Sequence, residues 1–217
     1  MGIVSSQSFG ANDHRFISEW GEHGKTEGGM FYFPQALSID GEGSIYVTDS
    51  GNARVQKFDS DGHFLASWGS SGTENGQFDY PVGIATYENF VYVVDKKLNK
   101  VQKFDSDGNF ILTWGDSGKN PGLFSSPTGI EIDANGNVYV VDTKNYRIQH
   151  FTTDGEFISS FGKFGNQDGT LRSPVDIAFY GDSLYVADPG NYKVEKYTKE
   201  GVFVKSFDYN FGGSAIR

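Results

Sequence analysis

Four aspartates in this chain are each followed, five positions later, by an arginine or a lysine. The four pairs are Asp49 and Arg54, Asp95 and Lys100, Asp142 and Arg147, and Asp188 and Lys193. One interpretation is a ring of charge around a central site. The other is that each acid caps a turn and pairs with a nearby base, because structural ion pairs often imitate functional sites. A ligand site usually breaks symmetry, so the recurrence favours the structural interpretation.

Residues that could hold a metal or act as nucleophiles form no recognisable centre. The histidines, His14, His23, His63 and His150, occupy unrelated positions, and the chain has no cysteine. The acids do not follow the spacing of an EF-hand, and the serines fit neither a nucleophile elbow nor a phosphate-binding loop. We therefore predict no catalytic residue, no bound metal and no cofactor.

The elements that position these residues repeat about every 46 or 47 residues. Besides the aspartates, the period is marked by prolines and by bulky aromatic residues: Pro34, Pro81, Pro127 and Pro174, then Trp68, Trp114, Phe161 and Phe207, with Trp20 one unit earlier. The letters VQKFDSDG occur at both residues 55–62 and residues 101–108. A repeat of this length with several short strands is typical of a β-propeller.

The second unit illustrates the strand pattern. Apolar or alternating runs at residues 82–85, 90–95, 100–105 and 110–114 predict four short strands. An Asp-Gly turn separates the last two strands, and it recurs at Asp61-Gly62 and Asp154-Gly155. Each unit is therefore predicted to be a four-stranded antiparallel blade in an all-β fold.

This pattern resembles the NHL repeat. The third unit matches it at Pro127, Gly129, Ile130, Val138, Tyr139, Val140, Asp142, Asn145, Arg147, Ile148, Gln149, Phe151, Asp154, Gly155, Phe157, Phe161 and Gly162. The resemblance covers roughly residues 16–207. It implies a β-propeller, typically of six and sometimes of five blades. NHL propellers serve as scaffolds, ligand-binding domains, RNA binders and some enzymes, so the resemblance alone does not fix the function.

The number of units is smaller than the resemblance implies. We expect four complete blades, at about residues 31–68, 78–114, 124–161 and 171–207, and an extra outer strand at residues 14–20. Residues 1–13 are expected to be a flexible segment and residues 208–217 a tail. Three interpretations follow: a piece of a larger propeller, an open arc that pairs with another copy, or an unusually small ring. Exposed strand edges would favour association.

A second group of residues departs from the repeat and forms the candidate binding surface. The loops before the first two prolines carry Tyr32, Phe33 and Tyr80, and Gln35 follows Pro34. Asp176 stands where other units have glycine or alanine, and it is expected near the propeller axis. Exposed aromatic residues on neighbouring loops are candidate hot spots. The alternative is that the aromatic residues only pack between neighbouring loops and that Asp176 is hydrated.

Charge and composition limit the partners. The formal net charge is -10, which repels phosphate backbones, and no stretch is long and apolar enough for a membrane helix. The sequence therefore predicts a soluble, cytoplasmic or exported, non-catalytic scaffold that binds a protein or a small ligand and forms a homo-oligomer or part of a larger propeller, without nucleic acid or membrane. The alternatives are a propeller lyase or lactonase with an acidic axial site, and an RNA-binding NHL domain.

Overall fold

The computed structural model describes residues 16–208. The predicted N-terminal flexible segment, His14 and the C-terminal tail beyond residue 208 lie outside the described residues. Within residues 16–208, no helix is long and apolar enough to span a membrane.

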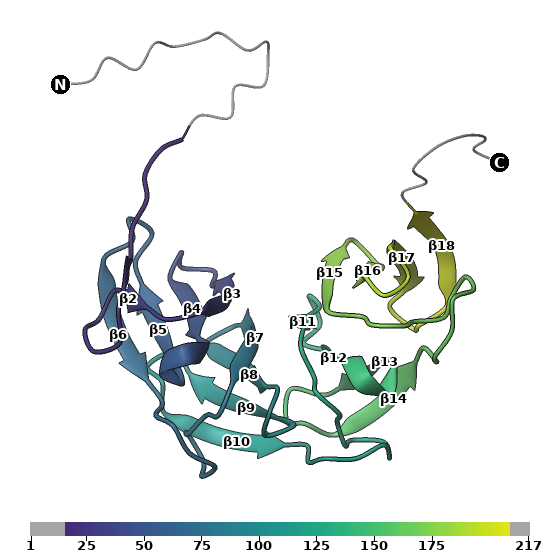
Figure 1. The fold of residues 1–217 in the computed structure, drawn as a ribbon, viewed down its shortest axis with the longest axis horizontal. Coiled ribbons are helices and arrows are strands. Elements are labelled where there is room, and N and C mark those ends of the chain that lie inside the picture. The colour runs from purple at the N-terminus through teal and green to yellow at the C-terminus, as the bar shows by residue number, and fades with distance from the viewer. Residues whose placement is uncertain (1–15, 209–217) are drawn as a thin grey trace, which may run out of the picture.

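Four antiparallel sheets of four strands each form the blades of an all-β propeller, as the repeat predicts (Figure 1). Blade 1 holds β3 (Pro34–Ile39), β4 (Ile45–Asp49), β5 (Arg54–Phe58) and β6 (Phe64–Trp68). Blade 2 holds β7 (Pro81–Tyr87), β8 (Phe90–Asp95), β9 (Lys100–Asp105) and β10 (Phe110–Trp114). Blade 3 holds β11 (Ile130–Ile132), β12 (Val138–Asp142), β13 (Arg147–Phe151) and β14 (Phe157–Phe161). Blade 4 holds β15 (Asp176–Tyr180), β16 (Ser183–Asp188), β17 (Lys193–Thr198) and β18 (Phe203–Asp208).

Turn chemistry sets these boundaries. The hairpins between the third and fourth strands carry Gly62, Gly108, Gly155 and Gly201 at positive φ, which glycine adopts without a Cβ clash. The second and third strands are joined by short 3-10 turns in blades 1 and 3, namely η1 (Ser50–Asn52) and η2 (Thr143–Asn145). A short parallel pair, β1 (Glu22–His23) with β2 (Met30–Phe31), precedes blade 1. The recurrent aspartates end the second strand of each blade, so they all lie at the same end of their blades.

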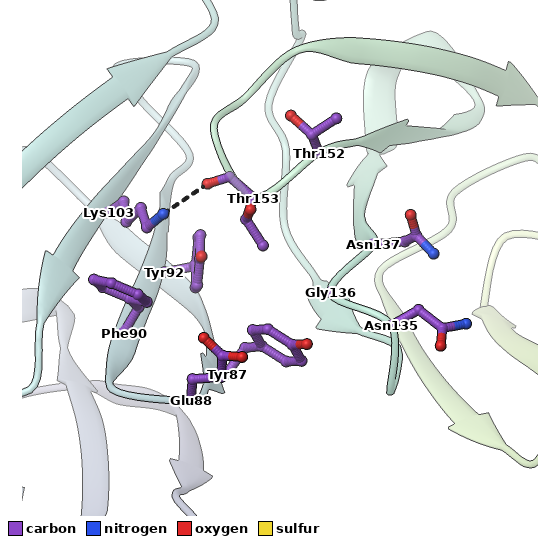
Figure 2. Close-up of a pocket in the computed structure, with 10 residues that line it drawn as sticks. All are labelled: Tyr87, Glu88, Phe90, Tyr92, Lys103, Asn135, Gly136, Asn137, Thr152 and Thr153. Carbon is purple, nitrogen blue, oxygen red and sulfur yellow. Dashed lines mark hydrogen bonds between the residues drawn. The ribbon is translucent and has the colours of Figure 1, made fainter.

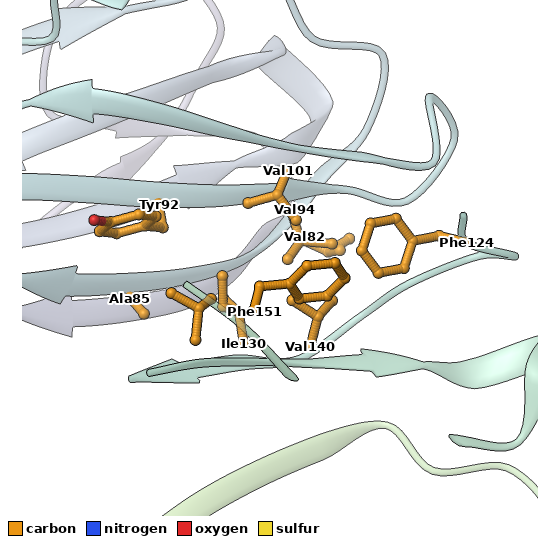
Figure 3. Close-up of a cluster of buried hydrophobic side chains, with 10 residues drawn as sticks. Val82, Ala85, Tyr92, Val94, Val101, Phe124, Ile130, Val140 and Phe151 are labelled. Carbon is orange, nitrogen blue, oxygen red and sulfur yellow. The ribbon is translucent and has the colours of Figure 1, made fainter. Parts of the chain in front are cut away.

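The core lies between the blades rather than inside one sheet. Between blades 2 and 3, for example, Tyr92 and Val101 of one blade pack with Ile130, Val140 and Phe151 of the next (Figure 3). Equivalent clusters lie between blades 1 and 2 and between blades 3 and 4. Each blade thus has two apolar faces and needs a neighbour on each side, which is the energetic basis of a propeller.

The four blades form an open arc, with β3 near one end and the strands of blade 4 at the other (Figure 1). Leu37 of blade 1 is 60% exposed, whereas its counterpart Ile84 in blade 2 is 5% exposed. At the other end Val194 is 40% exposed, whereas its counterpart Val101 is fully buried. The outermost face at each end of the arc therefore lacks the neighbour that every interior face has.

Residues 16–20, expected to be an extra outer strand, have no strand assignment in the structure. An outer strand requires the third strand of a blade beside it, and the described chain places no such blade before blade 1. Trp20 nevertheless packs on blade 1, with its ring centroid 4.5 Å from that of Phe58.

Candidate binding face

The recurrent aspartates lie in buried hydrogen-bond networks. The fully buried Asp142 accepts hydrogen bonds from the Ser125 backbone N–H at 2.7 Å, from Asn145 Nδ2 at 2.8 Å, from Arg147 Nε at 2.8 Å and from Gln149 Nε2 at 3.1 Å. Asp49 accepts the same four kinds of bond from Tyr32, Asn52, Arg54 and Gln56. A charge engaged by four donors has no capacity left for a ligand, so this geometry supports a structural role for the acids.

The basic partner behaves differently in the second blade. Asp95 is also buried, but it accepts backbone N–H groups of Asp79, Lys97 and Leu98. Lys100 donates instead to the Thr73 carbonyl at 3.1 Å, and burial lowers the pKa of its ammonium group. An arginine reaches the acid through Nε and a backbone carbonyl through Nη2, whereas lysine has one ammonium group at the end of its side chain. The acid–base pair expected from the sequence is therefore seen in blades 1 and 3, where the basic residue is an arginine.

Blade 4 replaces the arginine with Lys193. Its Nζ lies 3.0 Å from Asp168 Oδ1. Asp188 accepts the backbone N–H groups of Arg172 and Ser173 and a bond from Asn191 Nδ2. The acid therefore keeps its place in every blade, while the basic residue changes its contacts.

A groove lies where the first strands of the blades meet. Close approach of these strands depends on glycine: a Cβ on Gly83 would lie 2.2 Å from the Thr128 carbonyl oxygen, and one on Gly129 would lie 2.9 Å from Cα of Asp176. The groove has a volume of about 320 Å³, and its polar lining includes Gln35, Lys96, Thr128 and Asp176. The structure thus brings together two residues predicted from sequence, Gln35 and Asp176, and adds a lysine.

A second carboxyl group lies near this groove and was not anticipated. Burial, with a smaller contribution from the charge of Asp176, raises the pKa of Glu131 to about 7. Glu131 is on β11 beside Ile130. The corresponding positions in the other blades hold Ser38, Ala85 and Ala178. An acid at a position that is otherwise small was the available sequence signal.

The predicted aromatic residues do not form one cluster. Phe33 is 61% exposed and adopts φ of 56°, and its ring centroid lies 4.6 Å from that of Tyr32. Lys25 Nζ lies 4.4 Å from the Tyr32 ring centroid. Tyr80 packs in part against the core between blades 2 and 3. The structure therefore favours Phe33 and Tyr32 as surface aromatics and gives Tyr80 a packing role.

The described histidines are engaged at separate places. His23 lies against Tyr32, His63 Nδ1 is 2.9 Å from Asp59 Oδ2, and His150 stacks on Tyr139 at 4.4 Å. In the part of the chain that the structure describes, no group of three or more histidine, cysteine, aspartate or glutamate side chains is placed to hold a metal ion.

A second hollow of about 380 Å³ opens between blades 2 and 3, beside the β7–β8 hairpin (Figure 2). Tyr46 of blade 1 donates to Asp40, but blade 2 has Tyr87 at the position of that acid. The buried Tyr92 hydroxyl consequently has no hydrogen-bond partner among the described residues. Lys103 closes one side of the hollow by donating to the Thr153 carbonyl at 3.1 Å. This hollow is a place where the repeat is broken by a shorter hairpin.

Comparison with family models identifies NHL repeats at residues 31–58 and 124–151. Protein brain tumor of Drosophila melanogaster is 34% identical over 71 residues, which are 33% of this chain and 7% of that protein. Human NHL repeat-containing protein 3 is 39% identical over 64 residues, which are 28% of this chain and 18% of that protein. The matches therefore span a small part of these longer proteins.

Solved structures share the fold at low sequence identity. A streptogramin B lyase matches with a TM-score of 0.64 and 19% identity, over 81% of this chain and 54% of that chain. Hydrazine synthase of Kuenenia stuttgartiensis matches with a TM-score of 0.63 and 15% identity, over 85% and 51%. The inactive H270A virginiamycin B lyase of Staphylococcus aureus with quinupristin matches at 0.62 and 20%, over 81% and 55%. This chain spans about half the length of these solved chains.

Proposed function

Because the chain is an NHL-repeat β-propeller protein, we propose that it is a non-catalytic scaffold that binds an extended segment of a partner protein in the groove at the ends of its first strands. Phe33 is the anchor in this proposal. The groove contributes Lys96 on one blade and Asp176 on another, so it offers both charges to a bound main chain or side chain.

The exposed aromatic ring of Phe33, at a position with positive φ, carries this proposal. Bulky residues rarely adopt positive φ, and doing so costs on the order of 1 kcal/mol or more. Phe33 bears this cost while most of its ring faces solvent, where burial does not compensate for it. Aromatic side chains are frequent hot spots of protein recognition. Ser126, the equivalent residue of blade 3, also has positive φ, at 50°, so the turn itself recurs. The unusual feature is a large aromatic ring at this position that packs on Tyr32 and is otherwise open to solvent, which supports a role in binding.

The alternatives implied by the family have less support. A lyase or lactonase would need convergent catalytic side chains, and the described histidines are occupied at three separate places. RNA binding would have to overcome the net charge of -10. The Asp176 side chain in the lining of the groove also disfavours a phosphate backbone at the site itself.

Selection from a displayed library of random peptides tests the proposal. We expect peptides that bind the parent protein with micromolar affinity and lose at least tenfold in affinity to the Phe33→Gly variant, which should also be slightly more stable because glycine accepts the positive φ. Tyr180→Ser, a change at an 81% exposed aromatic on the β15–β16 hairpin, is the control and should bind normally. Equal affinity of the parent and Phe33→Gly for every selected peptide would reject Phe33 as the anchor.

Self-association is the second part of the proposed function. The observation that supports it is the exposure of Leu37 and Val194 at the two ends of the arc, where every interior counterpart is buried. Uncovered apolar faces favour association in water. The concentration dependence of the mass in solution tests this part independently of peptide binding.

A further inference from the structure

The two ends of the arc are the two halves of one interface. We call the side of a blade toward the next blade along the chain its leading face, and the opposite side its trailing face. Two faces have no blade against them in the arc (Figure 1). One is the leading face of blade 4, which carries Tyr185, Val194 and Phe207. The other is the trailing face of blade 1, which carries Leu37 and Phe58. Each carries the side chains that pack at the interior interfaces.

The leading face of blade 4 carries two aromatic rings at the same spacing as the leading face of blade 1, with an interplanar angle of 30° instead of 69°. The ring centroids of Tyr185 and Phe207 are 6.2 Å apart, and those of the equivalent Tyr46 and Trp68 are 6.1 Å apart. Val194 stands where Val55, Val101 and Ile148 are fully buried, yet it is 40% exposed. What this face lacks is a trailing face to cover it.

The trailing face of blade 1 is partly covered by the chain's own Trp20. At each interior interface an aromatic ring from the preceding blade lies against an aromatic ring and a turn glycine of the next blade. Trp68 meets Phe104 at 5.9 Å and Gly108, and Trp114 meets Phe151 at 5.9 Å and Gly155. Trp20 meets Phe58 at 4.5 Å and Gly62 in the same way.

Trp20 therefore occupies the place that the last aromatic residue of a preceding blade would take. Phe207 is that residue in blade 4, and it is 45% exposed. Trp20 packs over Phe58 but does not belong to a blade. Phe207 belongs to blade 4 but has no following blade to pack against. Leu37, on the same face as Phe58, remains 60% exposed, because residues 16–20 form no strand that could cover it.

Charges at the two ends are also complementary. In the first two interfaces a lysine on the leading face lies over a tyrosine ring and donates to the turn of the next blade: Lys57 to the Ser106 carbonyl at 3.2 Å, and Lys103 to the Thr153 carbonyl at 3.1 Å. Lys196 lies over Tyr185 at 5.5 Å in the same position on blade 4. The matching turn of blade 1 contains Asp59, Ser60 and Asp61, which would place acceptors and negative charge opposite Lys196.

The size of the arc indicates the occupant. The chain superposes on 51–55% of the length of solved propeller chains with TM-scores of 0.62–0.64, so two copies together have about the length of one such chain. A head-to-tail contact repeated twice closes on itself and leaves no face open. Resting on the self-association proposed above, we propose that two copies close into one ring, in which Phe207 of each copy replaces Trp20 of the other copy over Phe58.

Light scattering on two complementary variants tests this arrangement. Leu37→Asp disables only the trailing face, and Val194→Asp disables only the leading face. We expect the parent to show the mass of two copies at high concentration, each variant alone to show one copy, and an equimolar mixture to regain two copies, because the mixed pair keeps one intact interface. Leu65→Asp, at a 52% exposed residue of β6 away from both end faces, is the control and should behave as the parent.

The outcomes distinguish a failure of the head-to-tail arrangement from a failure of self-association itself. Two copies for both single variants would overturn the head-to-tail arrangement while leaving self-association in place. A mixture that stays at one copy would also overturn it, since complementary faces would then not meet. One copy for the parent and for Trp20→Ala at every concentration would remove self-association itself. Thermal unfolding of each variant confirms that the exposed substitutions leave the fold intact.

Trp20→Ala tests the exchange of aromatic rings. A copy that no longer covers its own Phe58 should bind its partner more tightly, by about tenfold, because no internal competitor has to leave first. Weaker association of Trp20→Ala would show that Trp20 belongs to the interface rather than competing for it. The double variant Trp20→Ala with Val194→Asp should remain a single copy. Its association would show that an uncovered Phe58 associates nonspecifically, without the leading face of another copy.

Discussion

Blades 3 and 4 are built from the same repeat but differ in how completely its contacts are made. In blade 3, Asp142 is bonded to Asn145, Arg147 and Gln149, and both faces of the sheet are covered. In blade 4 a lysine replaces the arginine, Glu195 replaces the glutamine, and one face is exposed. The repeated residues therefore build the blade, and blade 4, at one end of the arc, departs from blade 3 at both of these positions.

Glu195 is the sharpest of these differences. Gln149 donates to the Leu123 carbonyl at 2.7 Å and to Asp142 at 3.1 Å. Glu195 is equally buried, accepts a short hydrogen bond from the Tyr197 hydroxyl, and leaves Oε1 without a partner among the described residues. Burial raises the pKa of its carboxyl group. Blade 4 thus has a buried acid where blade 3 has a satisfied amide.

The largest effect is expected from Asp142→Ala. It leaves Arg147 and several buried donors without their acceptor, so unfolding should become easier by about 3–5 kcal/mol. Asp188→Ala in blade 4 should cost less, because that acid lacks the arginine and glutamine partners. Chemical denaturation measures both. An Asp142→Ala variant that unfolds like the parent would show that the recurrent acid is not structural.

Glu195→Gln should make blade 4 resemble blade 3 and stabilise the protein by about 1 kcal/mol at pH 8. An acid whose pKa is raised on folding destabilises the folded state as pH rises above its unfolded value of about 4.5. The advantage of the variant should therefore be small at pH 4 and grow as pH increases. Gln149→Glu should show the opposite trend, and denaturation midpoints across this range decide between them.

Glu131→Gln should give a smaller change of the same sign. The parent loses stability between the ordinary glutamate pKa of about 4.5 and the folded value of about 7, and the loss should level off above that value. The variant should lack this contribution. Two-dimensional NMR of the Glu131 carboxyl group would measure its pKa directly, and a value near 4.5 would contradict the effect of burial beside Asp176.

The tyrosines provide the last pair of variants, and Tyr92→Phe should give the smallest effect. Tyr46→Phe removes a hydrogen bond to Asp40 and should cost about 1 kcal/mol. Tyr92→Phe removes a hydroxyl that has no partner among the described residues, so it should be neutral or slightly stabilising. Equal losses for the two variants in thermal unfolding would mean that Tyr92 is bonded to water in the hollow beside it.

The sequence allowed the blades to be predicted closely because turn residues and strand patterns recur. The spans expected at residues 90–95, 100–105 and 110–114 coincide with β8, β9 and β10. Residues 16–20 matched the pattern but form no strand, because a strand also needs a neighbour that local sequence does not supply. Glu131 was missed because its pKa is raised mainly by burial, with a smaller contribution from Asp176, which lies 45 residues away in sequence. Both effects arise only when the blades pack.

Hydrogen exchange at two protein concentrations tests the contrast between interior and terminal blades most directly. The account predicts slow exchange in β12 and β13 at every concentration. In β17 and β3 it predicts faster exchange in dilute solution, slowing together at high concentration as the two end faces cover each other. Exchange in β17 that is as slow as in β13 in dilute solution, and unchanged by concentration, would contradict it.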